Sequence, residues 1–266
     1  FLLLEPEIKN TSTEIVEFKG SIAFKNVTYT YPGNEKPTLK NISFVIEPQD
    51  TLAILGKTAS GKSTILKLIL RQIDPQEGEI LIDGKPLTEI NLQSYRDAIG
   101  VVPQEVFLFS ETIKENILFG HTNPSTITQE MVEQTCKFCH VHHNIESFPL
   151  KYETVLGERG VNLSGGQKQR LSIARALIRK PKLLLLDDCL SAVDTHTEEI
   201  ILGHLKNDIH PLASIIVSHR ISSIRNANKI IVLDNGEIAE QGNHNNLLSK
   251  GNIYAELYFN QLTEEK

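Results

Sequence analysis

One segment of this 266-residue chain constrains its fold more than any other. A short apolar run, residues 51–55, leads into Gly56, and the residues from Gly56 to Ser63 follow the spacing G-x-x-x-x-G-K-S. Helical periodicity begins at Ser63. A strand, a glycine-bounded loop and a helix in that order open a βαβ unit, and the backbone N–H groups of such a loop turn inward around a phosphate. The segment therefore predicts an α/β fold with a phosphate-binding loop.

The side chains of this loop, which we call the P-loop (residues 56–63), have expected roles. Lys62 can reach the β- and γ-phosphates of a nucleoside triphosphate, and the Ser63 hydroxyl can bind Mg²⁺. Residues 183–186 are four leucines that precede Asp187, which is the pattern of a buried strand that delivers a carboxylate to the metal. Together these patterns predict a P-loop nucleoside triphosphatase. The residues expected to hold the nucleotide here are Gly56, Lys57, Thr58, Ala59, Ser60, Gly61, Lys62, Ser63 and Thr64.

Strand and helix patterns elsewhere divide the chain into three parts. Strand patterns occur at residues 22–31, 39–46, 79–82, 183–186, 214–217 and 230–239. Helical spacing without a strong strand pattern extends from about 110 to 180, and the first helix is expected to end near Asp74. Because βαβ units build parallel sheets, we expect a P-loop NTPase core with a mostly parallel sheet, an antiparallel β subdomain and an inserted helical subdomain.

Composition excludes some classes of function. The formal net charge of −6 argues against a nucleic-acid-binding protein, which normally carries a basic stripe, so no nucleic-acid partner is expected. Three cysteines do not make a disulfide framework and indicate a reducing compartment. The sequence has no run of about 18 consecutive apolar residues, the length that spans a bilayer.

A second motif narrows the class of triphosphatase. The segment Leu163-Ser164-Gly165-Gly166-Gln167 is followed by Lys168-Gln169-Arg170. Its serine and two glycines are expected to open a helix at Gln167, so that a hydroxyl and backbone N–H groups point at an anion. This segment resembles the signature motif of ABC ATPases. The resemblance implies that Ser164, Gly165, Gly166 and Gln167 contact the γ-phosphate held by the P-loop of a second ATPase domain.

The same resemblance implies roles for residues at four other places. Tyr31, just before Pro32, looks like the aromatic residue that stacks on adenine. Gln104 looks like the glutamine that contacts Mg²⁺ and the attacking water, which adds it to Ser63 and Asp187 as an expected metal ligand. His219 looks like the histidine that contacts the γ-phosphate. Residues 191–194 resemble the loop that communicates across the dimer.

Within the ABC family the chain is most similar to exporters. The resemblance extends from about residue 22 to 257 and includes the segments 91–96, 104–109 and 112–117. Residues 157–160 resemble the segment that contacts intracellular loops. The implied protein binds ATP and Mg²⁺ and hydrolyses ATP to power export across a membrane.

The exporter resemblance also implies a domain order and partners. Residues 1–19 are expected to be a linker from a transmembrane domain of the same chain, and residues 20–266 to be the ABC ATPase domain. The second ATPase domain would come from an identical chain or from an unlike half-transporter. The domain is expected at the cytoplasmic face of the membrane.

One catalytic position departs from the family pattern. A glutamate, the general base or water-orienting group, usually follows the metal-binding aspartate, and here that position is Asp188. Its carboxylate is one methylene shorter, about 1.5 Å. Since a misplacement of about 1 Å can cost on the order of 10²-fold in rate, we expect Asp188, Gln104 and His219 to form a slow catalytic site.

A cluster of cysteines and histidines offers other interpretations. Cys136, Cys139 and His140 match the haem-attachment string C-x-x-C-H, with His142 and His143 close by. We reject haem because the segment lies in the helical part of an ATPase. Zinc requires Cys136, Cys139 and His143 to share one helix face. Thiols that pack as small apolar groups are the favoured interpretation, and the same holds for Cys189.

Two further classes of function stay open at this point. In the first, the chain is a regulatory module that closes on ATP without efficient hydrolysis, and Asp188 alone favours it. In the second, it is a soluble ABC ATPase of repair or translation. That class would carry a second cassette or a long coiled-coil insertion and a basic surface, and the sequence contains none of these. The transported substrate is not encoded in this domain.

Overall fold

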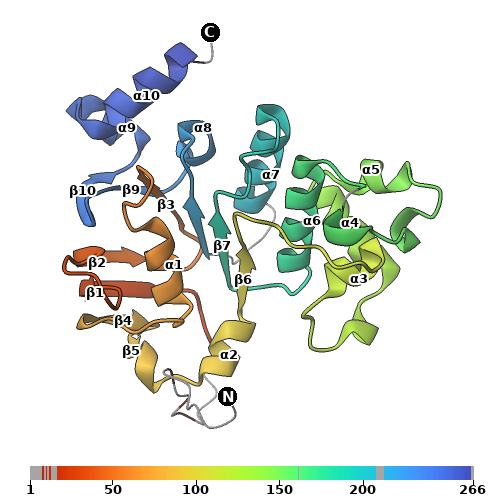
Figure 1. Ribbon diagram of the computed structural model, residues 1–266, viewed down its shortest axis with the longest axis horizontal. Helices are drawn as coiled ribbons and strands as arrows, with labels where there is room; N and C mark the ends of the chain where they lie inside the picture. Colours follow the sequence, from red (N-terminus) through yellow and green to blue (C-terminus); the bar gives the residue numbers. More distant parts are fainter. Residues whose placement is uncertain are drawn as a thin grey trace.

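Two sheets and ten helices organise the described part of the chain (Figure 1). The computed structural model describes residues 8, 10, 12, 17–160, 162–207 and 213–264. The larger sheet has six strands in the order β10 (Glu237–Gly242), β9 (Lys229–Asp234), β3 (Thr51–Gly56), β8 (Ala213–Val217), β7 (Leu183–Asp187) and β6 (Ile99–Val102). The smaller sheet has the order β2 (Leu39–Ile46), β1 (Ile22–Tyr29), β4 (Glu77–Ile82) and β5 (Lys85–Pro86).

Pairing directions separate the two sheets. Strands β9, β3, β8, β7 and β6 pair in parallel, and only β10 joins this sheet antiparallel. All pairs of the smaller sheet are antiparallel. The fold is therefore a P-loop NTPase core with a mostly parallel sheet and an antiparallel β subdomain, as the sequence predicts.

The helices lie around and beside these sheets. In chain order they are α1 (Lys62–Ile69), α2 (Leu92–Asp97), α3 (Ile113–Leu118), α4 (Gln129–Phe138), α5 (His142–Glu146), α6 (Gly165–Leu177), α7 (Thr195–Asn207), α8 (Ile221–Ile224), α9 (His244–Lys250) and α10 (Ile253–Glu264). Helices α3 to α6 form a separate lobe on the right of Figure 1, and α9 and α10 lie near the C-terminus at the opposite corner. No helix among the described residues is long and apolar enough to cross a membrane.

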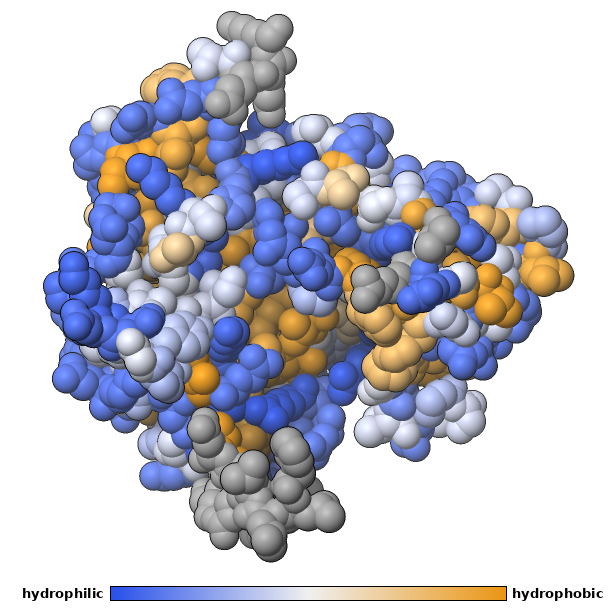
Figure 2. Space-filling view, viewed as in Figure 1, coloured by the Kyte–Doolittle hydropathy of each residue, from blue (hydrophilic) through white to orange (hydrophobic). Residues whose placement is uncertain are grey.

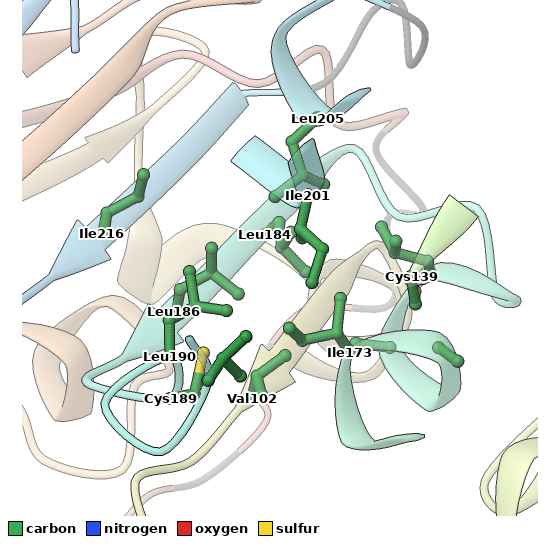
Figure 3. Packing of buried hydrophobic residues seen from close by; sticks show 14 of the residues in the cluster. Val102, Cys139, Ile173, Leu184, Leu186, Cys189, Leu190, Ile201, Leu205 and Ile216 are labelled. Atoms are coloured by element: carbon green, nitrogen blue, oxygen red, sulfur yellow. The ribbon is translucent and has the colours of Figure 1, made fainter. Parts of the chain in front are cut away.

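The central strands β3, β8 and β7 are mostly apolar because both faces of the large sheet are buried. On β7, Leu184 and Leu186 pack into one core cluster, whereas Leu183 and Leu185 pack into the other. The first cluster covers one face of the sheet and includes residues of the helical lobe and of α7 to α10; Figure 3 shows part of it. The second joins the large sheet to α1 and to the antiparallel sheet. The strand is thus clamped from two sides, which gives the residue after it a fixed position.

Three local predictions differ from the structure. Helix α1 ends at Ile69 rather than near Asp74, because Arg71 takes up a left-handed conformation just after it. Strand β6 has no counterpart among the predicted strands; its four residues are too few for a pattern to stand out. The C-terminal helices α9 and α10 were not predicted either. Most of the expected linker, residues 1–19, falls outside the described residues.

Asn116 on α3 holds the connection between the large sheet and the helical lobe. Its side chain is buried. The amide oxygen accepts from the Phe109 N–H at 2.8 Å and from Arg175 at 3.0 Å. The amide nitrogen donates to the carbonyls of Phe109, Glu111 and Thr112 at 3.0–3.3 Å. One side chain therefore supplements the backbone pairing of this loop, which is limited to an isolated bridge between Thr112 and Val155.

We expect Asn116→Ala to lower the free energy of unfolding by about 1–3 kcal/mol, because several partly buried backbone groups lose the hydrogen bonds of this buried amide. Chemical denaturation followed by circular dichroism measures the loss. Lys114→Ala, two residues earlier on the same helix, serves as the control and should change stability by less than about 0.5 kcal/mol. Equal stability of Asn116→Ala and the parent would contradict this role.

Candidate functional site

The carboxyl ends of three neighbouring strands bring the predicted site residues to one edge of the large sheet. In the parallel register, Ile54 of β3 lies opposite Val217 of β8, and Val217 lies opposite Asp187 of β7. The P-loop follows β3, His219 follows β8, and Asp187 ends β7. Strand β8 separates β3 from β7, so the residues after it enter the site between the other two. Ligands of open parallel sheets bind at such an edge.

A single pocket of about 480 Å³ opens at this edge. Twelve of its lining residues are predicted site residues: Tyr31, Thr58, Ala59, Ser60, Gly61, Lys62, Ser63, Thr64, Gln104, Asp187, Asp188 and His219. Asn34, Thr38 and Val217 complete the lining and were not predicted. Asn34 and Thr38 belong to the loop that begins at Pro32, so the turn beside Tyr31 was the available signal for them. The volume suits a small-molecule ligand.

The P-loop holds its lysine by backbone carbonyls. The Lys62 ammonium donates to the carbonyls of Gly56 at 2.7 Å and Lys57 at 2.8 Å. Burial lowers the pKa of Lys62, and the nearby carboxylates of Asp188 and Asp187 oppose that shift. Gly61, with φ of 106°, has no room for a side chain, because a Cβ would lie 2.5 Å from the Leu39 side chain. The loop is therefore preformed, with a cation at its centre.

Asp187 and Ser63 form an oxygen pair beside this lysine. The Ser63 hydroxyl donates to Asp187 Oδ2 at 3.5 Å. Burial raises the pKa of Asp187, and the neighbouring Asp188 carboxylate raises it further. Two oxygens that bind one Mg²⁺ at about 2.1 Å each lie no more than about 4.2 Å apart. The pair therefore fits a shared Mg²⁺, which would also relieve the crowding of negative charge.

Asp188 is hydrogen-bonded to the backbone at the end of β8 and to the N–H group of His219. Asp188 adopts a left-handed conformation with φ of 45°, and its N–H donates to the Val217 carbonyl at 2.8 Å. Its carboxylate Oδ1 accepts from the His219 N–H at 3.4 Å. Gln104, which follows β6, is exposed and lines the same pocket. The three residues predicted as catalytic therefore surround one space.

Tyr31 lies at the rim of the pocket in a polar and aromatic setting. Its hydroxyl lies 3.3 Å from Thr64 Oγ1 and accepts from Lys67 at 3.3 Å. The Lys67 ammonium also lies 5.2 Å from the ring centroid, and Tyr29 contacts the ring edge-on at 4.9 Å. These contacts fix the orientation of a half-buried ring, so that it can act as a stacking surface.

The signature residues lie at the start of α6 and are not among the residues that line this pocket. Ser164 is the N-cap residue, and its hydroxyl accepts a hydrogen bond from the Gln167 N–H. The side-chain oxygen of Gln167 in turn accepts a hydrogen bond from the Ser164 N–H. The helix therefore begins at Gly165, two residues before the predicted start at Gln167, because this capping box includes both glycines in the first turn. A Cβ on Gly166 would lie 2.8 Å from the Ala192 carbonyl oxygen.

Two polar residues that sequence reasoning missed connect the loops around the pocket. Gln169 on α6 accepts from the Ala192 N–H at 3.0 Å, which ties the signature helix to the loop of residues 191–194. Arg220, next to His219, donates to the Ser191 carbonyl at 2.8 Å and lies 3.7 Å from the buried Glu198 carboxylate. Burial raises the pKa of Glu198. Nothing in the local sequence pattern distinguishes these residues from surface polar groups.

Comparisons with known proteins match this arrangement. Residues 39–191 fit the profile of the family described as ABC transporter. The chain is 46% identical over 246 residues to the uncharacterized ABC transporter ATP-binding protein YfiB of Bacillus subtilis (strain 168). The aligned region covers 92% of this chain and 42% of that relative. It is 40% identical over 260 residues to the ATP-dependent lipid A-core flippase of Shewanella frigidimarina (strain NCIMB 400), covering 97% and 43% respectively.

A solved structure of a bacterial Atm1-family ABC exporter with ATP bound is similar in fold. It superposes with a TM-score of 0.86 and 39% sequence identity, over 91% of this chain and 42% of that one. The chain thus spans about two fifths of the length of the relatives it matches.

The cysteine and histidine cluster lies in the helical lobe, away from the pocket. Helix α4 ends at Phe138, and His140 adopts a left-handed conformation before α5 begins at His142. The shared helix face that a zinc site at Cys136, Cys139 and His143 would need does not form, because the chain turns between α4 and α5. No group of three metal-ligating side chains suits a metal ion among the described residues. His142 is hydrogen-bonded to the Tyr152 hydroxyl at 2.8 Å.

We expect the thiols of Cys136, Cys139 and Cys189 to be unreactive in the folded protein. All three are buried, and burial raises the pKa of Cys136 to about 12, which leaves almost no thiolate at pH 8. Iodoacetamide labelling followed by mass spectrometry should find no adduct within minutes in native protein and three in denaturant. Rapid labelling of Cys136 under native conditions would mean that the helical lobe opens around it.

Proposed function

This chain belongs to the ABC transporter family as an ATP-hydrolysing domain, and from that premise we propose that it powers the export of a substrate across a membrane. The single observation that carries the proposal is the meeting of the P-loop, Asp187, Gln104 and His219 in one pocket. These are a phosphate cradle, a carboxylate for a metal and polar groups for an attacking water, at the edge of a sheet where nucleotides bind.

The P-loop and Tyr31 would bind the two ends of ATP. Lys62 would exchange its two carbonyl partners for the β- and γ-phosphates, which form stronger charge-assisted hydrogen bonds. The N–H groups at the start of α1 add the positive end of a helix dipole. Tyr31, at the rim, would stack on the adenine.

Ser63, Asp187 and Gln104 would hold Mg²⁺. Both oxygen atoms of the Ser63–Asp187 pair are hard ligands of the kind that Mg²⁺ prefers. Mg²⁺ held by these residues would neutralise negative charge on the phosphates. With Mg²⁺ in place, Asp187 would remain ionised despite its burial, since a nearby opposite charge favours the carboxylate form.

Asp188 and His219 would control the attack of water on the γ-phosphate. Asp188 would orient the water and His219 would contact the γ-phosphate, while Gln104 contacts the water from β6. The short carboxylate of Asp188, already engaged by the His219 N–H at 3.4 Å, would reach the water poorly. The proposal therefore includes slow hydrolysis at this site, with binding of ATP intact.

A second ATPase domain would complete each site. The signature residues do not line the pocket of their own chain, and Ser164 is exposed at the start of α6. Two domains that face each other would each place this helix start on the other's γ-phosphate. The bond between Gln169 and residue 192 would transmit that contact to the loop of residues 191–194.

The helical lobe offers a surface for the membrane part of the protein. Phe107 and Phe119 are more than half exposed and form an aromatic cluster with Phe109, against which the Arg175 guanidinium packs. Hydrophobic groups also gather on the helical half of the face in Figure 2. Because the relatives are more than twice as long as this chain, we assign this patch to helices of a preceding transmembrane domain.

In that arrangement residues 1–19 are the linker, residues 20–266 are the ATPase domain, and residues 110–180 are its helical subdomain. The ATPase domain lies at the cytoplasmic face of the membrane, where ATP is available. The exposed aromatic patch would be covered there by the intracellular ends of membrane helices, which buries a surface that a free domain would leave in water.

We expect Lys62→Ala to abolish most ATP affinity, because the charge-assisted contact to the β- and γ-phosphates is lost. Isothermal titration calorimetry measures the dissociation constant for ATP. Lys25→Ala, on the antiparallel sheet and paired with Glu79, removes the same charge away from the pocket and should bind ATP like the parent. Unchanged binding in Lys62→Ala would rule out the P-loop as the nucleotide site.

We expect Asp188→Glu to raise kcat by about ten- to a hundredfold with little change in KM, because the longer carboxylate reaches the water. Asp188→Asn keeps the length without the charge and should lower kcat. Both variants require single-turnover assays in the full-length protein, where the partner's signature residues are present. If Asp188→Glu leaves the rate unchanged and the parent hydrolyses ATP well, the short carboxylate is adequate; if neither protein hydrolyses ATP, the chain acts as a regulatory module.

A further inference from the structure

Helix α10 presents one face to the rest of the domain, and that face ends in a polar residue. Tyr254 is fully buried, and Leu257 and Tyr258, three and four residues later, pack against the core. The next position of this stripe, i+7, is Gln261. An apolar residue would continue the pattern. Because this position is a glutamine, we expect polar groups of the neighbouring chain segment to face the helix here.

The start of α10 is anchored firmly enough to define where Gln261 lies. The Tyr254 N–H donates to the buried Glu240 carboxylate of β10 at 3.1 Å. The Tyr254 hydroxyl is hydrogen-bonded to His244 Nδ1 of α9 at 2.7 Å. Two helical turns, about 10 Å of a rigid helix, separate this anchor from Gln261.

The polar groups that Gln261 meets are those of the turn after β8. Its amide nitrogen donates to the His219 carbonyl at 2.6 Å, and its amide oxygen accepts from the Ile221 N–H at 2.8 Å. Ile221 is the first residue of α8, whose N-cap, Arg220, makes no side-chain cap. The N–H groups of a first helical turn have no partner within the helix, so Gln261 supplies from another helix what the local sequence lacks.

In the turn of residues 218–221, side chains hold several backbone groups, while the Ser218 N–H donates to the Ile54 carbonyl of β3 at 3.3 Å. The His219 N–H donates to Asp188 at 3.4 Å, and the Arg220 N–H donates to the Ser218 hydroxyl at 3.0 Å. Gln261 holds two further groups of this turn, the His219 carbonyl and the Ile221 N–H. His219 thus lies between the acidic pair of the pocket and the C-terminal helix, and its backbone position depends on both.

We propose that Gln261 is a positioning residue for His219: the C-terminal helix α10 sets the place of the histidine that faces the nucleotide pocket, through two hydrogen bonds to the turn that carries it. The inference rests on the proposed role of His219 at the γ-phosphate. Gln261 itself does not line the pocket, so it acts on the chemical step through the position of His219 and leaves the grip on ATP to the P-loop.

A positioning role for Gln261 predicts an effect on kcat that a purely structural contact would not have. Loss of the two bonds frees the His219 carbonyl and the Ile221 N–H to find water, and the turn gains freedom to move the imidazole. A misplacement of about 1 Å is enough to lower the rate strongly. Lys62, Ser63 and Tyr31 are untouched, so KM for ATP should stay near the parent value.

The test compares variants of the full-length protein by steady-state ATPase kinetics and thermal unfolding. Gln261→Ala should lower kcat by about tenfold, with KM changed by less than twofold and the melting temperature near that of the parent. Gln261→Glu can still accept from the Ile221 N–H and has no donor for the His219 carbonyl at neutral pH, so its kcat should fall between the two. Asn260→Ala, exposed and adjacent on the same helix, is the control and should match the parent.

Three outcomes overturn the proposal: an unchanged kcat in Gln261→Ala, a loss that appears in KM instead of kcat, or an equal loss in Asn260→Ala. His219→Ala separates this failure from that of the proposed function. A strong loss of kcat in His219→Ala together with a normal Gln261→Ala means that α10 does not position the histidine. A normal kcat in His219→Ala means that the assigned role of His219 is itself wrong.

Discussion

The parallel pairing of β3, β8 and β7 is the constraint on which the rest of this structure depends. Because Ile54, Val217 and Asp187 share one row of the sheet, the chain leaves all three strands at the same height. The P-loop, the turn that carries His219 and the pair Asp187–Asp188 then face one pocket. A shift of one residue in either pairing would turn the side chains of a whole strand to the opposite face, and both buried clusters resist that shift.

Around this edge the protein uses single side chains to hold irregular backbone. Asn116 fills the loop between β6 and α3, Gln169 holds residue 192, and Gln261 holds the turn after β8. Each is an amide, which donates and accepts at once and so can satisfy both kinds of backbone group. The irregular loops around the pocket are therefore tied to helices by few hydrogen bonds.

The pocket contains a lysine ammonium and two carboxylates, which suits a ligand that carries both negative and positive charge. Asp187 and Asp188 stand side by side, and burial raises the pKa of Asp187 while it lowers that of Lys62. A triphosphate with Mg²⁺ supplies anions to the lysine and a cation to the carboxylates, so binding would stabilise the charged form of each group. Asp188 serves this balance as well as a glutamate would.

Much of this protein could be read from local order along the chain. The strand, loop and helix around Lys62, the leucine run before Asp187 and the signature at Ser164 each occupy consecutive residues, and local spacing determines their backbone conformation. The apolar strands that must lie in a two-faced sheet were also evident, because burial on both faces leaves no polar alternation. These features were enough for the fold class and for the expected residues of the pocket.

Tertiary structure alone decided how these pieces meet. Strand β8 lies between β3 and β7, and Gln261 contacts His219, so residues far apart in sequence become neighbours. The signature residues, in contrast, do not line the pocket of their own chain. Such contacts depend on strand order and helix packing, which periodicity does not encode. The break between α4 and α5 is a similar case: His140 adopts a left-handed conformation there, which separates His143 from the helix of Cys136, and the sequence pattern did not indicate it.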